Sequence, residues 1–145
     1  MKNKSLFLIG MVITAVIAFY SCSKDKDNLS DEEMKNFITS NTWAYDTLEI
    51  SNENDIGLIF AALAYQMVYD GGEYEFDNDG TYTLTSTLAG TMNGDWEIQD
   101  GKMIMDQGTG DEATYEVLTV NNSKLDLKFV LEGSTGYLIL KFISQ

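Results

Sequence analysis

The chain has 145 residues, a length that suits one small domain with a single core. It carries 9 lysines and no arginine against 23 aspartates and glutamates, so its formal net charge is −14. A chain this acidic repels the phosphates of nucleic acids, and we expect no nucleic-acid partner. Because the chain also lacks histidine and has one cysteine, Ser-His-Asp and Cys-His catalysis and His-based zinc sites are excluded. We therefore predict a protein that is not an enzyme, with no catalytic residue and no cofactor.

The first residues have the pattern of a secretory signal peptide. Lys2 and Lys4 are followed by an apolar segment over residues 6–20 and by the small residue Ser21. As a helix, the apolar segment would be about 22 Å long, shorter than the roughly 30 Å core of a bilayer, which disfavours a transmembrane anchor. The segment resembles the signal peptide of bacterial lipoproteins, in which a small residue precedes a cysteine that is acylated and becomes the mature N-terminus. By this resemblance, Cys22 is the site of lipid attachment.

The resemblance divides the chain into a lipoprotein signal peptide over residues 1–21, a lipidated flexible tether over 22–29, and a domain over 30–145. It implies a protein of the cell envelope whose partner is the outer membrane, reached through the lipid on Cys22. In some Gram-negative bacteria an acidic run after the lipidated cysteine directs a lipoprotein to the cell surface. Asp25 and Asp27 are similar to that run, but Lys24 and Lys26 interrupt it. A surface-exposed and a periplasm-facing orientation therefore both stay open.

The domain is predicted to begin with a short helix and to continue as strands. Ser30 and Glu33 have the spacing of a capping box, which predicts a helix over residues 31–39. From Thr42 onward, polar and apolar residues alternate between turn residues, which is typical of short antiparallel strands. The pattern predicts eight strands, over residues 42–50, 73–77, 81–88, 95–99, 102–106, 113–120, 124–131 and 137–143. Short turns join all but the first pair, which favours an up-and-down barrel over the alternative of an open sandwich.

A second helix is predicted between the first two strands. Asn54 and Asp55 supply a capping residue, residues 56–69 are apolar on nearly every side, and glycines follow Asp70. A helix without a polar face is normally covered on more than one side. We expect this one to pack across an open barrel end and partly against the N-terminal helix; a lid, or an element facing a membrane or a ligand, is the alternative.

Short motifs along the strands identify a family resemblance. They are Trp43 on the first strand, Tyr74-x-Phe76-x-x-Asp79-Gly80-x-Tyr82, Gly94-Asp95-Trp96, Asp100-Gly101, and Leu125-x-Leu127. These residues resemble the lipocalin-like lipoprotein domains of Gram-negative bacteria, although Asn41 stands where lipocalins have glycine and the second helix is an addition. The resemblance implies an all-β, eight-stranded antiparallel barrel that holds a small apolar ligand.

The strand alternation places aromatic and aliphatic side chains on one face, where they either line a cavity or fill a core. The candidate ligand-binding residues are Trp43, Phe60, Tyr74, Phe76, Tyr82, Trp96, Leu127 and Phe129. Two non-catalytic functions are predicted: a module that binds a small apolar molecule, or a protein-interaction or structural subunit of an envelope complex whose barrel is filled. A carboxylate enzyme would need two acids that converge in a cleft.

One acidic stretch has the spacing of a calcium loop. Glu75, Asp77 and Asp79 before Gly80 are spaced like the start of an EF-hand loop. The position of the final bidentate glutamate is occupied by Ser86. The sequence therefore predicts no metal site.

Overall fold

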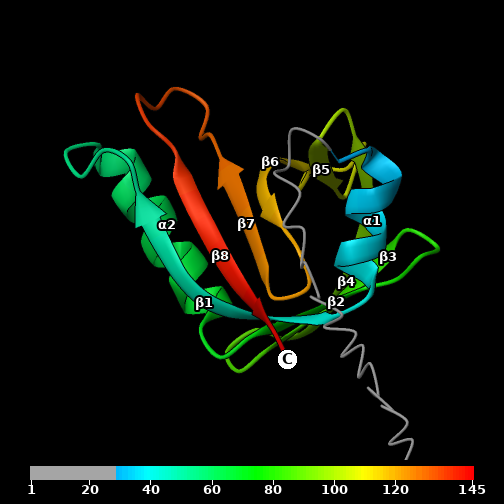
Figure 1. Cartoon of the computed structure of the whole chain (residues 1–145). Helices are drawn as coiled ribbons and strands as arrows, with labels where there is room; N and C mark the ends of the chain where they lie inside the picture. Colours follow the sequence, from blue (N-terminus) through cyan, green and yellow to red (C-terminus); the bar gives the residue numbers. More distant parts are fainter. Residues whose placement is uncertain (1–28) are drawn as a thin grey trace, which may run out of the picture.

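The computed structural model describes residues 29–145; the predicted signal peptide, Cys22 and the predicted tether up to residue 28 lie outside the described residues. The described part forms two helices and eight strands (Figure 1). In chain order they are α1 (Asp31–Thr39), β1 (Thr42–Ile50), α2 (Ile56–Tyr69), β2 (Glu73–Phe76), β3 (Thr81–Ser86), β4 (Gly90–Gln99), β5 (Lys102–Met105), β6 (Ala113–Val120), β7 (Lys124–Phe129) and β8 (Leu138–Ser144).

The strands close into an antiparallel barrel in which neighbours in the chain are neighbours in space. The closing contact is between β1 and β8, whose register runs from Trp43 opposite Ser144 to Ile50 opposite Leu138. A closed barrel leaves no unpaired strand edge, which an open sandwich would have. The predicted eight-stranded up-and-down barrel is confirmed, and the sandwich alternative is excluded.

Strand β4 begins five residues earlier than the predicted start at Asp95. Its first half pairs with the whole of β3, from Thr81 opposite Asp95 to Ser86 opposite Gly90. Residues 90–94 show no alternation of polar and apolar side chains, so the sequence pattern did not predict a strand there. Pairing with β3 supplies the backbone hydrogen bonds that extend the strand.

Helix α1 covers the barrel end that holds the β2–β3 and β4–β5 turns. The predicted capping box at its start is formed. The carboxylate of Asp31 accepts hydrogen bonds from the backbone N–H groups of Asp100 and Gly101, at 2.8 and 2.9 Å. The indole Nε1 of Trp43 donates to the carbonyl of Ile38 at 2.8 Å. These bonds fix the helix across its end of the barrel.

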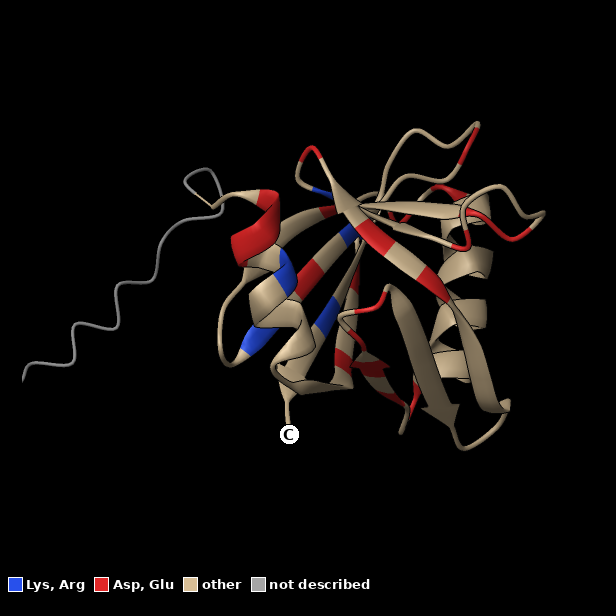
Figure 2. Ribbon diagram, turned by 90° about the vertical axis from the view of Figure 1, so that its right-hand side faces the viewer, with Lys and Arg blue, Asp and Glu red and all other residues tan. Residues whose placement is uncertain are grey.

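Helix α2 packs across the opposite end, as predicted. Helix α2 connects β1 to β2, and this connection lies at the barrel end opposite the β2–β3 and β4–β5 turns, where α1 lies. The two helices are well separated in Figures 1 and 2. The expectation that α2 rests partly against the N-terminal helix is therefore wrong. One carboxylate oxygen of Asp55 caps α2 through the N–H groups of Gly57 and Leu58, and the other accepts from the N–H of Thr135 in the β7–β8 loop at 3.0 Å.

The core is formed by alternate residues of the strands that point into the barrel. On α2, Leu58 and Ala62 are buried against Leu138, forming a smaller cluster beside the main one.

Among residues 29–145, neither helix has the length and apolar content needed to cross a bilayer.

Candidate functional site

The barrel interior collects most of the predicted ligand-binding residues. Those that are buried there are Trp43, Tyr74, Phe76, Tyr82, Trp96 and Leu127. Phe129 is half-buried and packs against the same cluster.

Phe60 does not belong to this interior. Its side chain is 68% exposed. Leu58 and Ala62, two positions away on either side, face the barrel. Since a helix turns by about 200° over two residues, a side chain between these two points away from the barrel. The sequence correctly assigned Phe60 to the second helix. It did not indicate which face of that helix the barrel covers.

Aromatic rings form a continuous series from one barrel end to the other. The ring centres of Tyr69 on α2 and Tyr74 are 5.6 Å apart. The ring centres of Tyr74 and Phe76 are 5.3 Å apart, and those of Phe76 and Trp96 are 4.9 Å apart. At the α1 end, the Lys35 ammonium lies 5.8 Å from the Trp96 ring centre. Ring pairs at such distances contribute roughly 0.5–1.5 kcal/mol each beyond the burial of their area. The interior is therefore held by mutual packing of large rings.

Tyrosine hydroxyls lie close together at the barrel end that α2 covers. The hydroxyl oxygens of Tyr65 and Tyr115 are 3.1 Å apart, and Tyr82 donates to the Asp106 carboxylate at 2.8 Å. Burial is the main cause that raises the pKa of Tyr74 and Tyr115 well above the ordinary value of 10.0. These hydroxyls stay neutral at physiological pH, so they serve as hydrogen-bonding groups and not as bases.

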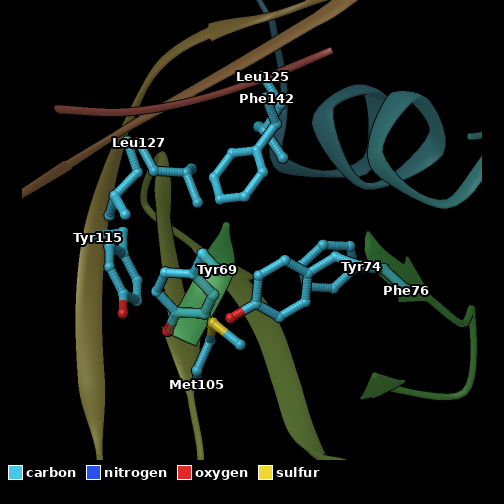
Figure 3. Close-up of a pocket in the computed structure, with 9 residues that line it drawn as sticks. Tyr69, Tyr74, Phe76, Met105, Tyr115, Leu125, Leu127 and Phe142 are labelled. Carbon is cyan, nitrogen blue, oxygen red and sulfur yellow. The ribbon is translucent and has the colours of Figure 1, made fainter. Parts of the chain in front are cut away.

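The free space inside the barrel is small. It is lined mainly by aromatic and aliphatic side chains, drawn in Figure 3: Tyr69, Tyr74, Phe76, Met105, Tyr115, Leu125, Leu127, Leu140 and Phe142. Its volume is about 10 Å³, which is room for about one water molecule. Sites for drug-sized ligands occupy roughly 300–1,000 Å³. In this conformation the barrel is filled by its own side chains.

Several interior residues were not among those predicted. Tyr65 and Tyr69 are four residues apart, so they share one face of α2, and this spacing was a signal that could have identified them. Tyr115 alternates with the buried Val117 on β6. Met105 lies on β5, where the preceding residues are also apolar. Without alternation of polar and apolar residues, the sequence did not indicate that the Met105 side chain points into the barrel.

The outward side of α2 carries an exposed apolar surface. We call Ile56, Phe60, Leu63 and Met67 the α2 outer face; their side chains are 68, 68, 52 and 63% exposed. They occupy positions i, i+4, i+7 and i+11, so they form one stripe along the helix. Leu88 on the β3–β4 turn is 67% exposed and lines the same groove as Leu63 and Met67.

Two neighbouring grooves lie beside this stripe, and Leu63, Gln66 and Asp70 line both of them. One, of about 560 Å³, lies between the end of α2 and the β3–β4 turn, and the other, of about 240 Å³, lies between α2 and β1. Asp70 lines both grooves and Asp46 lines the second, whereas no lysine lines either. Figure 2 shows acidic residues spread over the strands and loops, while the ribbon of α2 carries no charged residue. The surface around α2 is thus apolar along the helix and acidic beside it.

The carboxylates do not converge on the interior. In the described part of the chain every aspartate and glutamate is exposed or half-buried, and none lines the small interior space. Across residues 29–145 no group of three or more His, Cys, Asp or Glu side chains is placed to hold a metal ion. Two places in the described part of the chain are therefore candidate binding sites: the ring-filled interior and the α2 outer face.

Comparisons with known proteins add a likeness in fold. The sequence matches no described family profile, and it matches none of the curated proteins with which it was compared. Among solved structures, it is similar to the crystal structure of a DUF4847 family protein from Bacteroides vulgatus ATCC 8482, with 16% sequence identity and a TM-score of 0.49. The alignment covers 77% of this chain and 97% of that one. A likeness this distant does not bear on function.

Proposed function

We propose that the protein is a lipid-anchored, non-catalytic module of the cell envelope that binds another protein through the α2 outer face. One observation carries this proposal: four large apolar side chains on one helix face lie in solvent, each more than half exposed. Contiguous apolar patches of this kind are uncommon on monomeric proteins and usually mark binding surfaces. The filled interior supports the same reading, because it leaves no room for a ligand without rearrangement.

The anchoring part of the proposal rests on the sequence around Cys22. Several acyl chains are needed for stable attachment, because each buried methylene contributes about 0.8 kcal/mol and a single chain binds reversibly. Growth with labelled palmitate is expected to label the wild-type protein and not Cys22→Ala. Equal labelling of both would remove the anchor from the proposal.

The binding part is tested in cells that make the protein naturally. A photo-crosslinking amino acid at position 60 is expected to join the full chain to one discrete protein, identifiable by mass spectrometry. The same probe at Ile143, which is exposed on β8, is the control and is expected to give no such product. Absence of a specific adduct from position 60, with the chain correctly folded and expressed, would contradict the proposal.

A second candidate function is the binding of a small apolar ligand inside the barrel, as the lipocalin-like resemblance implies. The observation in its favour is the group of tyrosine hydroxyls beneath α2, which could orient a ligand if Tyr65 and Tyr69 moved out with the helix. Native mass spectrometry of the protein from cells would then show a bound small molecule. Protein free of such a molecule, and unable to take one up from an apolar extract, would exclude this candidate.

A further inference from the structure

The charges around the α2 outer face restrict what can bind there. Glu53 and Asp55 lie just before the helix, and Asp70 lies just after it. Asp46, on β1, lines the groove on one side of α2 together with Asp70. Asp46 and Asp70 also both raise the pKa of Tyr45, after burial, which places the two carboxylates near the same ring. An apolar stripe therefore lies between acidic groups at both of its ends.

We propose that the α2 outer face binds an apolar helix of a partner protein that carries lysine or arginine at its two ends. This inference rests on the proposed function and names its partner class. An amphipathic helix can place its apolar side chains against the stripe and in the two adjoining grooves. Its basic ends would meet the acidic groups that flank α2, which favours correct partners and faster association.

The same charges disfavour the other occupants of an apolar helix face. In a symmetric pair of copies packed antiparallel through α2, the Asp55 end of one helix would meet the Asp70 end of the other. That arrangement brings like charges together with no basic residue on α2 to offset them. A membrane surface is disfavoured as well, because helices that lie in the lipid interface carry lysine or arginine, and anionic headgroups repel acidic groups.

The test uses the full lipidated chain in nanodiscs of neutral phosphatidylcholine, with a photo-crosslinking residue at position 67. The probes are helical peptides of about 18 residues, long enough to form helices. One has leucines at helical spacing, lysines in its first and last turns and glutamine at the remaining positions. The second has glutamate in place of every lysine, and the third is a scrambled version of the first. We expect the leucine-lysine helix to crosslink about tenfold more than either of the others. Crosslinking to lipid, to a second copy, or equally to all three peptides would overturn the inference.

Matched substitutions locate the interaction. Phe60→Ser is expected to lower crosslinking of the leucine-lysine peptide about tenfold, since it removes a large exposed apolar side chain from the contact. Ile143→Ser, which changes an exposed apolar residue on β8, is expected to have no effect. Asp70→Lys should lower crosslinking severalfold, whereas Glu97→Lys on the exposed face of β4 should not. Unequal unfolding temperatures would reveal any variant that lost its fold.

The two levels of the proposal fail in different ways. If no peptide binds but the probe at position 60 still joins the chain to one protein in cells, the basic helical partner is wrong and the proposed function stands. If Phe60→Ser and Asp70→Lys leave peptide binding unchanged, the peptide binds elsewhere and the inference is overturned. If no peptide is crosslinked and no cellular protein is joined to position 60, both proposals are contradicted.

Discussion

The hydroxyl oxygen of Tyr65 on α2 lies 3.1 Å from that of Tyr115 on β6, so the helix is hydrogen-bonded to the barrel from the inside. Tyr65 also packs edge to face against Phe129, with 5.7 Å between ring centres. The inward side of α2 is thereby part of the core, while its outward side stays in solvent. Contact with the core accounts for the apolar residues on the inward side of α2, whereas the outward stripe has no such contact within residues 29–145.

We expect Tyr65→Phe to destabilise the protein by about 1 kcal/mol, because it removes one hydroxyl and leaves a buried tyrosine with one partner fewer. Urea unfolding followed by circular dichroism measures the loss. Tyr137→Phe, at an exposed position, is the control. If the two substitutions cost the same, the inner hydroxyl contact does not hold α2 in place.

Gly94→Ala is expected to be strongly destabilising, by about 2–3 kcal/mol, because the added methyl group cannot be accommodated. A Cβ at Gly94 would lie 2.1 Å from the Asp106 carboxylate and 2.6 Å from the Tyr82 ring, and those two groups are hydrogen-bonded to each other. Gly110→Ala, where nothing lies within 4 Å, is the matched control and should be nearly neutral. Equal midpoints of urea unfolding for the two variants would contradict the close packing of Gly94.

The stability contributed by Asp55 should depend on pH. Hydrogen bonds from the backbone N–H groups of Thr135 and Leu58 lower the pKa of Asp55 from its ordinary value of 3.8. A carboxyl whose pKa is lower in the folded state stabilises the fold above the unfolded pKa, and this contribution is lost as pH falls through the folded value. Asp55→Asn is therefore expected to have a lower Tm than the wild type at pH 7.

That difference in Tm should shrink as the pH is lowered below 3.8, because protonated Asp55 then resembles asparagine. Thermal unfolding between pH 7 and pH values below 3 measures it. Glu97→Gln, on an exposed strand face, serves as the reference for general acid effects. A Tm difference that stays constant over this range would show that the charge of Asp55 is not what matters.

Leu127→Ala is expected to cost about 2–5 kcal/mol and to create an interior cavity. Leu127 is buried and borders the small space beneath α2, so its truncation enlarges that space. Benzene should then raise the Tm of the variant and leave the wild type unchanged, because apolar cavities of sufficient size bind it. Val130→Ala, at an exposed position, is the control. A wild-type protein that responds to benzene as strongly as the variant would show that its interior is less filled than described.

Local sequence patterns determined both helices and most of the strand positions of this fold. The capping residues Ser30 and Asp55 predicted where α1 and α2 begin, and both helices have the predicted bounds. Period-two alternation predicted which side chains of β2 and β3 face inward, including Tyr74, Phe76 and Tyr82. These predictions succeed because capping and alternation depend on residues only a few positions apart.

Features that depend on distant parts of the chain were decided by the tertiary structure. Pairing of β1 with β8 closes the barrel, and no local pattern shows whether the first and last strands of the domain will meet. The exposure of Phe60 follows from which face of α2 the barrel covers, and an all-apolar helix does not reveal that face. The filled interior is set by the summed volumes of side chains from all eight strands and α2 packed together. The sequence by itself determined both helices, most of each strand and the inward-facing rings of β2 and β3. Packing decided that the rings fill the barrel and that α2 presents its apolar stripe to solvent.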